Sequence, residues 1–173
     1  MSEQSIEQRL GDRLREADHT VATAESCTGG LVGAALTAVP GASDYFEGGI
    51  VAYAYDAKRH LLGVSRESLD ERGAVSGRVA REMARGVRDK TDATWGLSTT
   101  GVAGPTGGTE ETPVGTVYVG VAYAGEWGTE TSYATATRHR FDGDRAAVRE
   151  STVEQTLADL SAELDGAGGR SVE

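Results

Sequence analysis

Apolar residues recur every three to four positions in several stretches of the chain, and this spacing predicts amphipathic helices. The first such stretch places Ile6, Leu10 and Leu14 on one face. The predicted helices cover residues 5–18, 28–39, 56–62, 76–89 and 143–164.

Shorter runs, bounded by glycine or polar residues, predict strands between these helices. A turn at 125–128 joins the last two strands as a hairpin. Because helices separate the earlier strands, we expect an α/β fold with helices on both faces of a mixed sheet. The predicted strands cover residues 19–25, 50–55, 94–100, 116–123 and 129–139, with a loop at 43–49.

The domain organisation follows from the absence of any internal repeat or linker. We expect one domain over residues 1–165 and a disordered polar tail over 166–173.

Charge and composition narrow the class of protein. Asp and Glu total 27 against 17 Lys and Arg, which gives a formal net charge of −10. This balance disfavours nucleic acid as a partner and suits a concentrated salt solution, where charge repulsion is screened. No run approaches the roughly 18 apolar residues of a membrane span, and the polar N-terminus does not resemble a signal peptide. We therefore expect a cytoplasmic protein with no membrane partner.

The stretch TAESCTGG brings a carboxylate, two hydroxyls and a thiol to the end of the first predicted strand. Ser26 there would lie beside the backbone N–H groups that open a helix, which can hold an anion or a developing oxyanion. In the alternative interpretation, Ser26 or Thr28 only caps that helix. Cys27 is more typical of a small buried residue than of a nucleophile. The candidate binding residues of this turn are Cys27, Thr28, Gly29 and Gly30.

One of only two lysines, Lys58, falls in the first turn of a predicted helix capped by Asp56. A cation opposes the helix dipole there, and a partly desolvated lysine can lose its proton and act as a base. The alternative is a solvated surface lysine. Tyr53 lies at the end of the preceding strand.

A glycine-rich loop over residues 101–115 follows the third predicted strand. Such loops present backbone donors to phosphate or carboxylate, although this one lacks the P-loop and dinucleotide-binding spacings. Near the start of the last helix, Arg145 could reach a phosphate or pair with Asp142 or Asp144. The candidate residues of the loop are Thr100, Gly101, Gly104, Gly107 and Gly108.

The three histidines show no metal-site spacing, and none pairs with Ser26. A serine–lysine pair is therefore the available nucleophile and base, and we expect no metal and no other cofactor.

The motifs TAESCTGG, GGIVAYAYDAK, GAVS, TTGVAGPTGGTEETPVGTV and FDGDRAAVR occur in the order seen in the CinA C-terminal domain family. The chain resembles this family from about residue 6 to residue 160. Two positions depart from the usual pattern: Thr112 replaces a lysine, and Tyr55 replaces an asparagine.

This resemblance implies a three-layer α/β/α domain that forms a homo-oligomer and hydrolyses the carboxamide of nicotinamide mononucleotide. It also implies that Ser26 is the nucleophile, Lys58 the base and Tyr53 a residue that relays or orients the proton. The glycine loop and Arg145 would hold the phosphate of this small-molecule nucleotide. A nucleotide-binding regulatory module without catalysis, and an amidase that depends on Cys27, are the alternatives.

Overall fold

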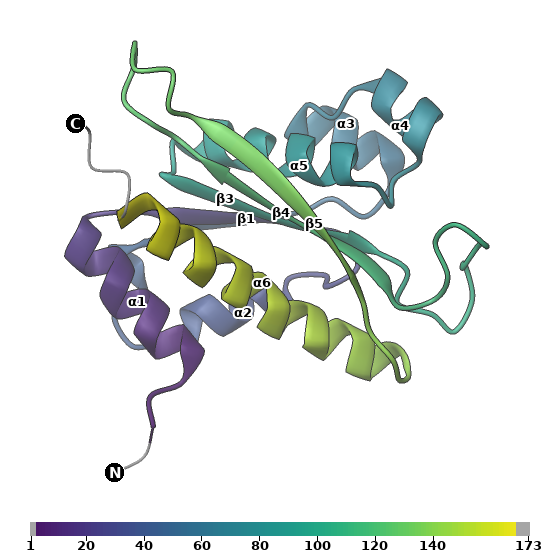
Figure 1. Ribbon diagram of the computed structural model, residues 1–173, viewed down its shortest axis with the longest axis horizontal. Coiled ribbons are helices and arrows are strands. Elements are labelled where there is room, and N and C mark those ends of the chain that lie inside the picture. The colour runs from purple at the N-terminus through teal and green to yellow at the C-terminus, as the bar shows by residue number, and fades with distance from the viewer. Residues whose placement is uncertain (1–2, 169–173) are drawn as a thin grey trace.

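Five strands form the sheet at the centre of the molecule (Figure 1). They are β1 (Val21–Glu25), β2 (Phe46–Val51), β3 (Trp95–Gly101), β4 (Thr116–Tyr123) and β5 (Tyr133–Arg140). The computed structural model describes residues 3–168. In the order β2-β1-β3-β4-β5, β1 is parallel to both its neighbours, and β4 is antiparallel to both of its own. The sheet is therefore mixed, as predicted.

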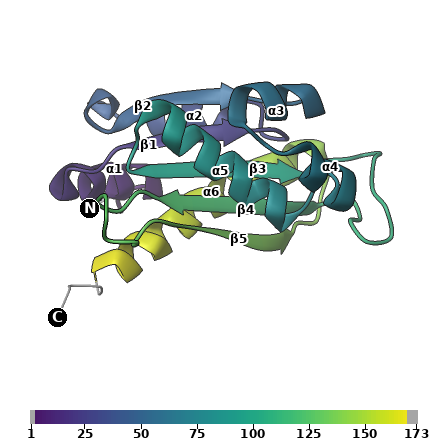
Figure 2. The same ribbon diagram turned by 90° about the horizontal axis from the view of Figure 1, so that it is seen from above.

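Helices cover both faces of this sheet. They are α1 (Ile6–Ala17), α2 (Leu31–Thr37), α3 (Tyr55–Leu62), α4 (Arg66–Arg72), α5 (Gly77–Thr91) and α6 (Arg145–Gly168), with a short 3-10 helix η1 (Ala42–Asp44). α1, α2 and α6 lie on one face, and α3, α4 and α5 lie on the other (Figure 1, Figure 2). This arrangement confirms the predicted α/β fold with three layers.

The apolar faces of the helices form the core. Leu10 and Leu14 are buried in one cluster with Leu157 and Leu160 of α6, as the helical repeat predicted for α1. Burying a side chain of this size contributes about 1.5–3 kcal/mol. The face of α5 predicted from Val79, Met83 and Val87 is buried in a second cluster on the other side of the sheet.

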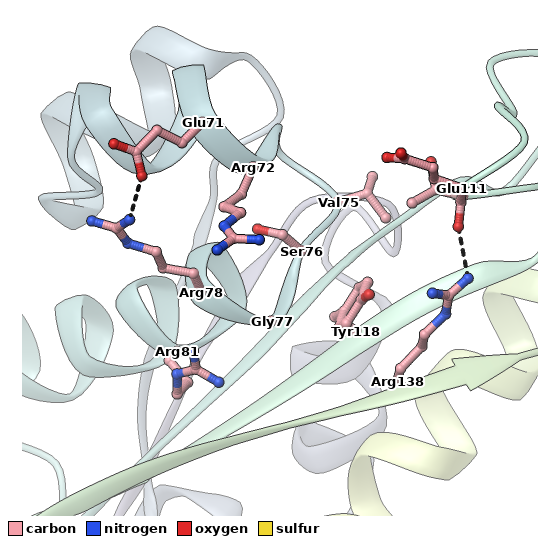
Figure 3. Close-up of a pocket in the computed structure, with 11 residues that line it drawn as sticks. Glu71, Arg72, Val75, Ser76, Gly77, Arg78, Arg81, Glu111, Tyr118 and Arg138 are labelled. Atoms are coloured by element: carbon pink, nitrogen blue, oxygen red, sulfur yellow. Dashed lines mark hydrogen bonds and ion pairs between the residues drawn. The ribbon is translucent and has the colours of Figure 1, made fainter.

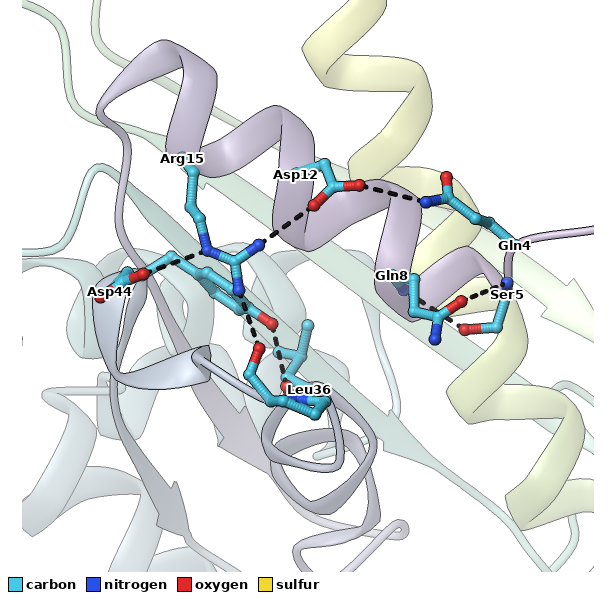
Figure 4. A network of polar contacts seen from close by, with 9 residues as sticks. Gln4, Ser5, Gln8, Asp12, Arg15, Leu36 and Asp44 are labelled. Atoms are coloured by element: carbon cyan, nitrogen blue, oxygen red, sulfur yellow. Dashed lines mark hydrogen bonds and ion pairs between the residues drawn. The ribbon is translucent and has the colours of Figure 1, made fainter.

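The ends of α1 are tied by polar contacts (Figure 4). Ser5 accepts a hydrogen bond from the Gln8 amide and donates its own amide to the Gln8 side chain, which makes a capping box. In the last turn, the Arg15 guanidinium donates to the Asp44 carboxylate and to the Pro40 carbonyl. α1 is thereby linked to the segment that leads into β2.

Two glycines let α5 approach its neighbours backbone to backbone. A Cβ atom at Gly86 would lie 2.0 Å from the Leu62 carbonyl oxygen at the end of α3. A Cβ atom at Gly96 of β3 would lie 2.1 Å from the Ala84 carbonyl oxygen. α5 therefore packs against both α3 and the sheet at distances that no larger residue allows.

Several predicted boundaries were wrong. β2 begins at Phe46, inside the predicted loop, because the Gly48–Gly49 segment pairs with β1 as an edge strand. Gly49 is needed there, since a Cβ atom would lie 2.7 Å from the Thr23 hydroxyl. β5 begins four residues later than predicted. α6 runs through the first residues of the predicted tail to Gly168, and residues 169–173 lie outside the described residues.

Within residues 3–168, no helix combines the length and the apolar character needed to span a membrane.

Candidate functional site

The turn that follows β1 is organised by the carboxylate of Glu25, which is 2% exposed. One oxygen accepts hydrogen bonds from the Thr28 hydroxyl at 2.6 Å and the Val32 amide at 2.8 Å, and the other accepts from the Gly33 amide at 3.0 Å. Glu25 therefore accepts hydrogen bonds from the first turn of α2, where the helix dipole favours a negative charge. The alternative that Ser26 or Thr28 caps this helix was wrong, because the N-cap residue is Gly30 and makes no side-chain cap.

Ser26 and Lys58 meet at the carboxyl end of β1. The Lys58 Nζ atom lies 2.9 Å from the Ser26 Oγ atom. It also donates to the carbonyl oxygens of Ala52 at 3.0 Å and Tyr53 at 2.9 Å. The Ser26 amide donates to the Thr99 carbonyl, which attaches the turn to β3. The pairing expected between the serine and the lysine is thus present.

Lys58 is buried, which excludes the alternative of a solvated surface lysine. Only 1% of the residue is exposed, and none of the ion pairs among residues 3–168 includes it. Burial lowers the pKa of Lys58 from 10.5 to about 8. The neutral amine is therefore a minor form of this side chain at pH 7 and becomes the main form above about pH 8, well below the range of an ordinary lysine.

The helix that carries Lys58 begins one residue earlier than predicted. α3 has Ala54 as its N-cap, without a side-chain cap, and Asp56 pairs with Arg59 on the surface instead. The prediction that Asp56 caps this helix was therefore wrong. On the same helix His60 is exposed and points to another face than Lys58.

Arg145 connects Tyr53 with the glycine-rich loop. Its guanidinium donates to the Gly104 carbonyl at 2.9 Å and to the Tyr53 hydroxyl at 3.1 Å. The alternative ion pairs with Asp142 and Asp144 are not among the contacts of the described chain. Arg145 is exposed, so its guanidinium is accessible from solvent.

The contacts of Tyr53 do not support the predicted proton relay. Its carbonyl oxygen accepts from Lys58, but its hydroxyl accepts from Arg145, and the residue is 59% exposed. The backbone of Tyr53 therefore orients the amine, while its side chain extends the site toward Arg145.

Sequence reasoning missed the role of Arg149. This residue lies one helical turn after Arg145, and its guanidinium donates to the carbonyl oxygens of Cys27 at 3.1 Å and Thr28 at 3.2 Å. It holds the backbone of the serine turn from α6, which lies in the same helix layer as α2. The spacing of the two arginines was visible in the sequence, but nothing there indicated the partner turn more than a hundred residues away.

The glycine-rich loop is only partly at the site. Gly101 ends β3, and Thr100 donates its hydroxyl to the Ala74 carbonyl, so this side chain stabilises the fold. Gly104 is buried at a φ of 84°, and a Cβ atom there would lie 2.5 Å from Val114. Gly107 and Gly108 are exposed, and the loop that carries them projects from the molecule (Figure 2). Gly104 is thus the loop residue that the structure brings to Arg145.

Cys27 is buried beside Ser26, and burial raises the pKa of its thiol to about 11. The thiol is therefore protonated at neutral pH and is a poor nucleophile. We expect the native protein to react with iodoacetamide far more slowly than the unfolded chain, and Cys27→Ala to keep most of any hydrolytic activity. Mass spectrometry of samples labelled for increasing times measures the rate of the iodoacetamide reaction. Rapid labelling of the native protein at neutral pH would favour the alternative of an amidase that depends on Cys27.

No group of three or more metal-ligating side chains is found in the described part of the chain. The contacts described above give a candidate site made of the buried pair Ser26 and Lys58, the turn held by Glu25 beside it, and the exposed Arg145 at its edge.

Comparison with known sequences gives one family. A family model described as the CinA C-terminal domain matches residues 3–164. A CinA-like protein of Salinibacter ruber is 52% identical over 146 residues, which are 84% of this chain and 34% of that protein. A putative competence-damage inducible protein of Halothermothrix orenii is 52% identical over 69% of this chain and 29% of its own. The chain thus spans about a third of the length of these curated relatives.

Solved structures extend the likeness to the fold. The competence/damage inducible protein CihA from Agrobacterium tumefaciens has 36% identity and a TM-score of 0.85, covering 95% of this chain and 99% of its own. A CinA superfamily protein from Enterobacter cloacae has 34% identity and a TM-score of 0.84, with 95% and 98% covered.

Proposed function

The chain belongs to the CinA C-terminal domain family, and from this premise we propose that it hydrolyses the carboxamide of nicotinamide mononucleotide to nicotinate mononucleotide and ammonia. The observation that carries the proposal is the contact of 2.9 Å between the buried Lys58 amine and the Ser26 hydroxyl. A serine at its ordinary pKa is a weak nucleophile and needs a neighbouring base.

The surroundings of Lys58 suit the role of that base. A neutral amine has two N–H bonds and one lone pair, and the carbonyl oxygens of Ala52 and Tyr53 can accept both N–H bonds. The lone pair then points to the remaining neighbour, the Ser26 hydroxyl. Two backbone carbonyls from the β2–α3 connection thus orient the amine for proton transfer.

The reaction then proceeds in two steps. Ser26 Oγ attacks the carboxamide carbon while its proton passes to Lys58, and the protonated amine returns this proton to the leaving nitrogen as the C–N bond breaks. Ammonia departs and an ester of Ser26 remains. Water attacks this ester while Lys58 takes one of its protons, and Lys58 returns that proton to Ser26 Oγ as the C–O bond to Ser26 breaks. The free serine and a carboxylic acid result, and the acid loses its proton to solvent to give the carboxylate.

The negative charge on the tetrahedral intermediate needs nearby donors. In the described structure the amides of Thr28 and Gly30 donate no hydrogen bond within the protein. We assign the oxyanion to the free amides of this turn. The contacts of Glu25 and Arg149 with the same turn support the proposal, because they keep its backbone in one conformation.

The test is a direct assay of purified protein with nicotinamide mononucleotide and measurement of released ammonia. Wild-type protein should release ammonia and nicotinate mononucleotide in equal amounts, and Ser26→Ala should release neither above background. Binding of the mononucleotide without turnover by wild-type protein would instead identify a regulatory module and overturn the enzymatic proposal.

The proposed phosphate site makes a separate prediction. Arg145→Ala should raise KM for the mononucleotide at least about tenfold, because it removes a charge-assisted contact worth about 1.5–3 kcal/mol. Nicotinamide riboside lacks the phosphate, so it should be a poor substrate whose kinetics Arg145→Ala hardly changes. Steady-state kinetics with both substrates decides this, and equal losses for both would place Arg145 outside the phosphate site.

A further inference from the structure

A cavity of about 450 Å³ lies on the α4–α5 side of the sheet (Figure 3). Its walls come from the end of α4, the start of α5, the glycine-rich loop and the neighbouring strands β4 and β5. The residues that line it are Glu71, Arg72, Val75, Ser76, Gly77, Arg78, Arg81, Glu111, Thr112, Tyr118 and Arg138. None of the residues assigned to the proposed amidase site is among them.

Four of these lining residues are arginines, and two are acids. In a chain where acids outnumber basic residues by 27 to 17, a cavity with an excess of guanidinium groups departs from the overall composition. Like charges near one another are unfavourable unless an anion balances them. The cavity therefore has the charge of a site for an anionic ligand.

The two acids do not neutralise the cluster. Glu71 pairs with Arg78 at 2.9 Å, and Arg138 donates to the backbone carbonyl of Glu111 instead of to a carboxylate. The side chains of Arg72 and Arg81 make no hydrogen bond or ion pair with any other residue between 3 and 168. In Figure 3 the Arg72 side chain extends from α4 toward Ser76 at the start of α5. Two guanidinium groups at the cavity are thus available to an incoming ligand.

The start of α5 adds to this positive field. The 15-residue helix begins at Gly77, and its cap Ser76 accepts from the Val79 amide. The positive end of the helix dipole therefore lies in the cavity wall beside Arg72. A guanidinium group and a helix N-terminus both bind phosphate oxygens well.

We propose that this cavity is a second ligand site, and that it binds a small phosphate-bearing anion through Arg72, Arg81 and the start of α5. The ligand need not be the substrate of the Ser26 site, because the two sites share no lining residue. Thr100 links them structurally: its hydroxyl bonds to the Ala74 carbonyl, and its backbone lies beside Tyr118 in the sheet. Occupancy of the cavity can thus influence the segment that separates the two sites.

The experiment is calorimetric titration with inorganic pyrophosphate of protein that already carries Arg145→Ala, which removes the phosphate contact of the proposed amidase site. This protein should bind pyrophosphate saturably. Adding Arg72→Gln and Arg81→Gln should weaken the binding at least tenfold. Arg85→Gln is the matched control, because Arg85 lies exposed on the same helix outside the cavity and should change the affinity less than twofold.

Three outcomes overturn the proposal: no saturable binding of pyrophosphate, an equal loss in the Arg85→Gln control, or binding of citrate as tight as that of pyrophosphate. The last would show a general site for polyanions. Thermal melting of each variant, with midpoints close to that of the parent protein, confirms that a loss of binding reflects the removed guanidinium groups.

Discussion

Replacing Lys58 by arginine is expected to lower kcat by about a thousandfold or more, even though the positive charge is kept. General-base assistance contributes about 10²–10⁴ in rate, and arginine cannot release its proton in a protein. Lys58→Met, which keeps a side chain of similar length without an amine, should be equally inactive. His60→Gln, on the exposed face of the same helix, is the control and should retain activity.

Stopped assays of ammonia release, together with melting curves for each variant, provide the measurement. A Lys58→Arg protein that keeps a substantial fraction of wild-type kcat would mean that the site uses the charge of Lys58 and not its basicity. The serine–lysine mechanism would then have to be abandoned.

The lowered pKa of Lys58 also predicts the pH dependence. The neutral amine is the active form, so kcat/KM should rise about tenfold per pH unit below about 8 and level off above it.

The stability of the fold should also increase with pH because of Lys58. Between the pKa of about 8 in the folded protein and the ordinary value of 10.5, the unfolded chain binds more protons, so the free energy of unfolding rises with pH. Lys58→Met should remove this contribution.

Replacing Glu25 by alanine is expected to lower the free energy of unfolding by about 3 kcal/mol or more. The substitution leaves the amides of Val32 and Gly33 and the hydroxyl of Thr28 without their acceptor in a buried place, and each unsatisfied group costs about 1–3 kcal/mol. Glu25→Gln keeps the shape and one acceptor oxygen, so its loss should be smaller.

Urea denaturation followed by circular dichroism measures these differences. The matched control is Glu47→Ala in β2, where the glutamate is exposed and the change should stay within about 0.5 kcal/mol. A loss for Glu25→Ala no larger than that of the control would contradict the assigned role of the carboxylate.

The parts of the fold that follow from local patterns could be predicted. The helical repeats of α1 and α5 identified their buried faces, because burial of one face is what such repeats reflect. The start of β2 could not be predicted, because glycine disfavours a strand by itself and only pairing with β1 holds it there.

The residues of the candidate site likewise fall into those that the sequence could identify and those that only the folded structure defines. Ser26 and Lys58 could be singled out because their residue types fit a nucleophile and a base and because their motifs resemble a known family. The roles of Glu25 and Arg149 depend on which backbone groups lie opposite them, and these become defined only when α2 and α6 dock on the sheet. The role of Tyr53 was the least predictable, since its carbonyl oxygen accepts a hydrogen bond from Lys58 while its hydroxyl accepts one from Arg145.

The contact of Gly86 with α3 has a consequence for how the activity can be lost. The end of α3 rests on the backbone of α5 at this glycine, and Lys58 lies one turn earlier on the same helix. An added methyl group at position 86 would push α3 outward, and a shift of about 1 Å would take the amine beyond hydrogen-bonding distance of Ser26. A substitution at Gly86 can thus remove the activity although Ser26 and Lys58 are both unchanged. Measurement of kcat and of the unfolding midpoint of Gly86→Ala would show whether the activity falls while the fold persists.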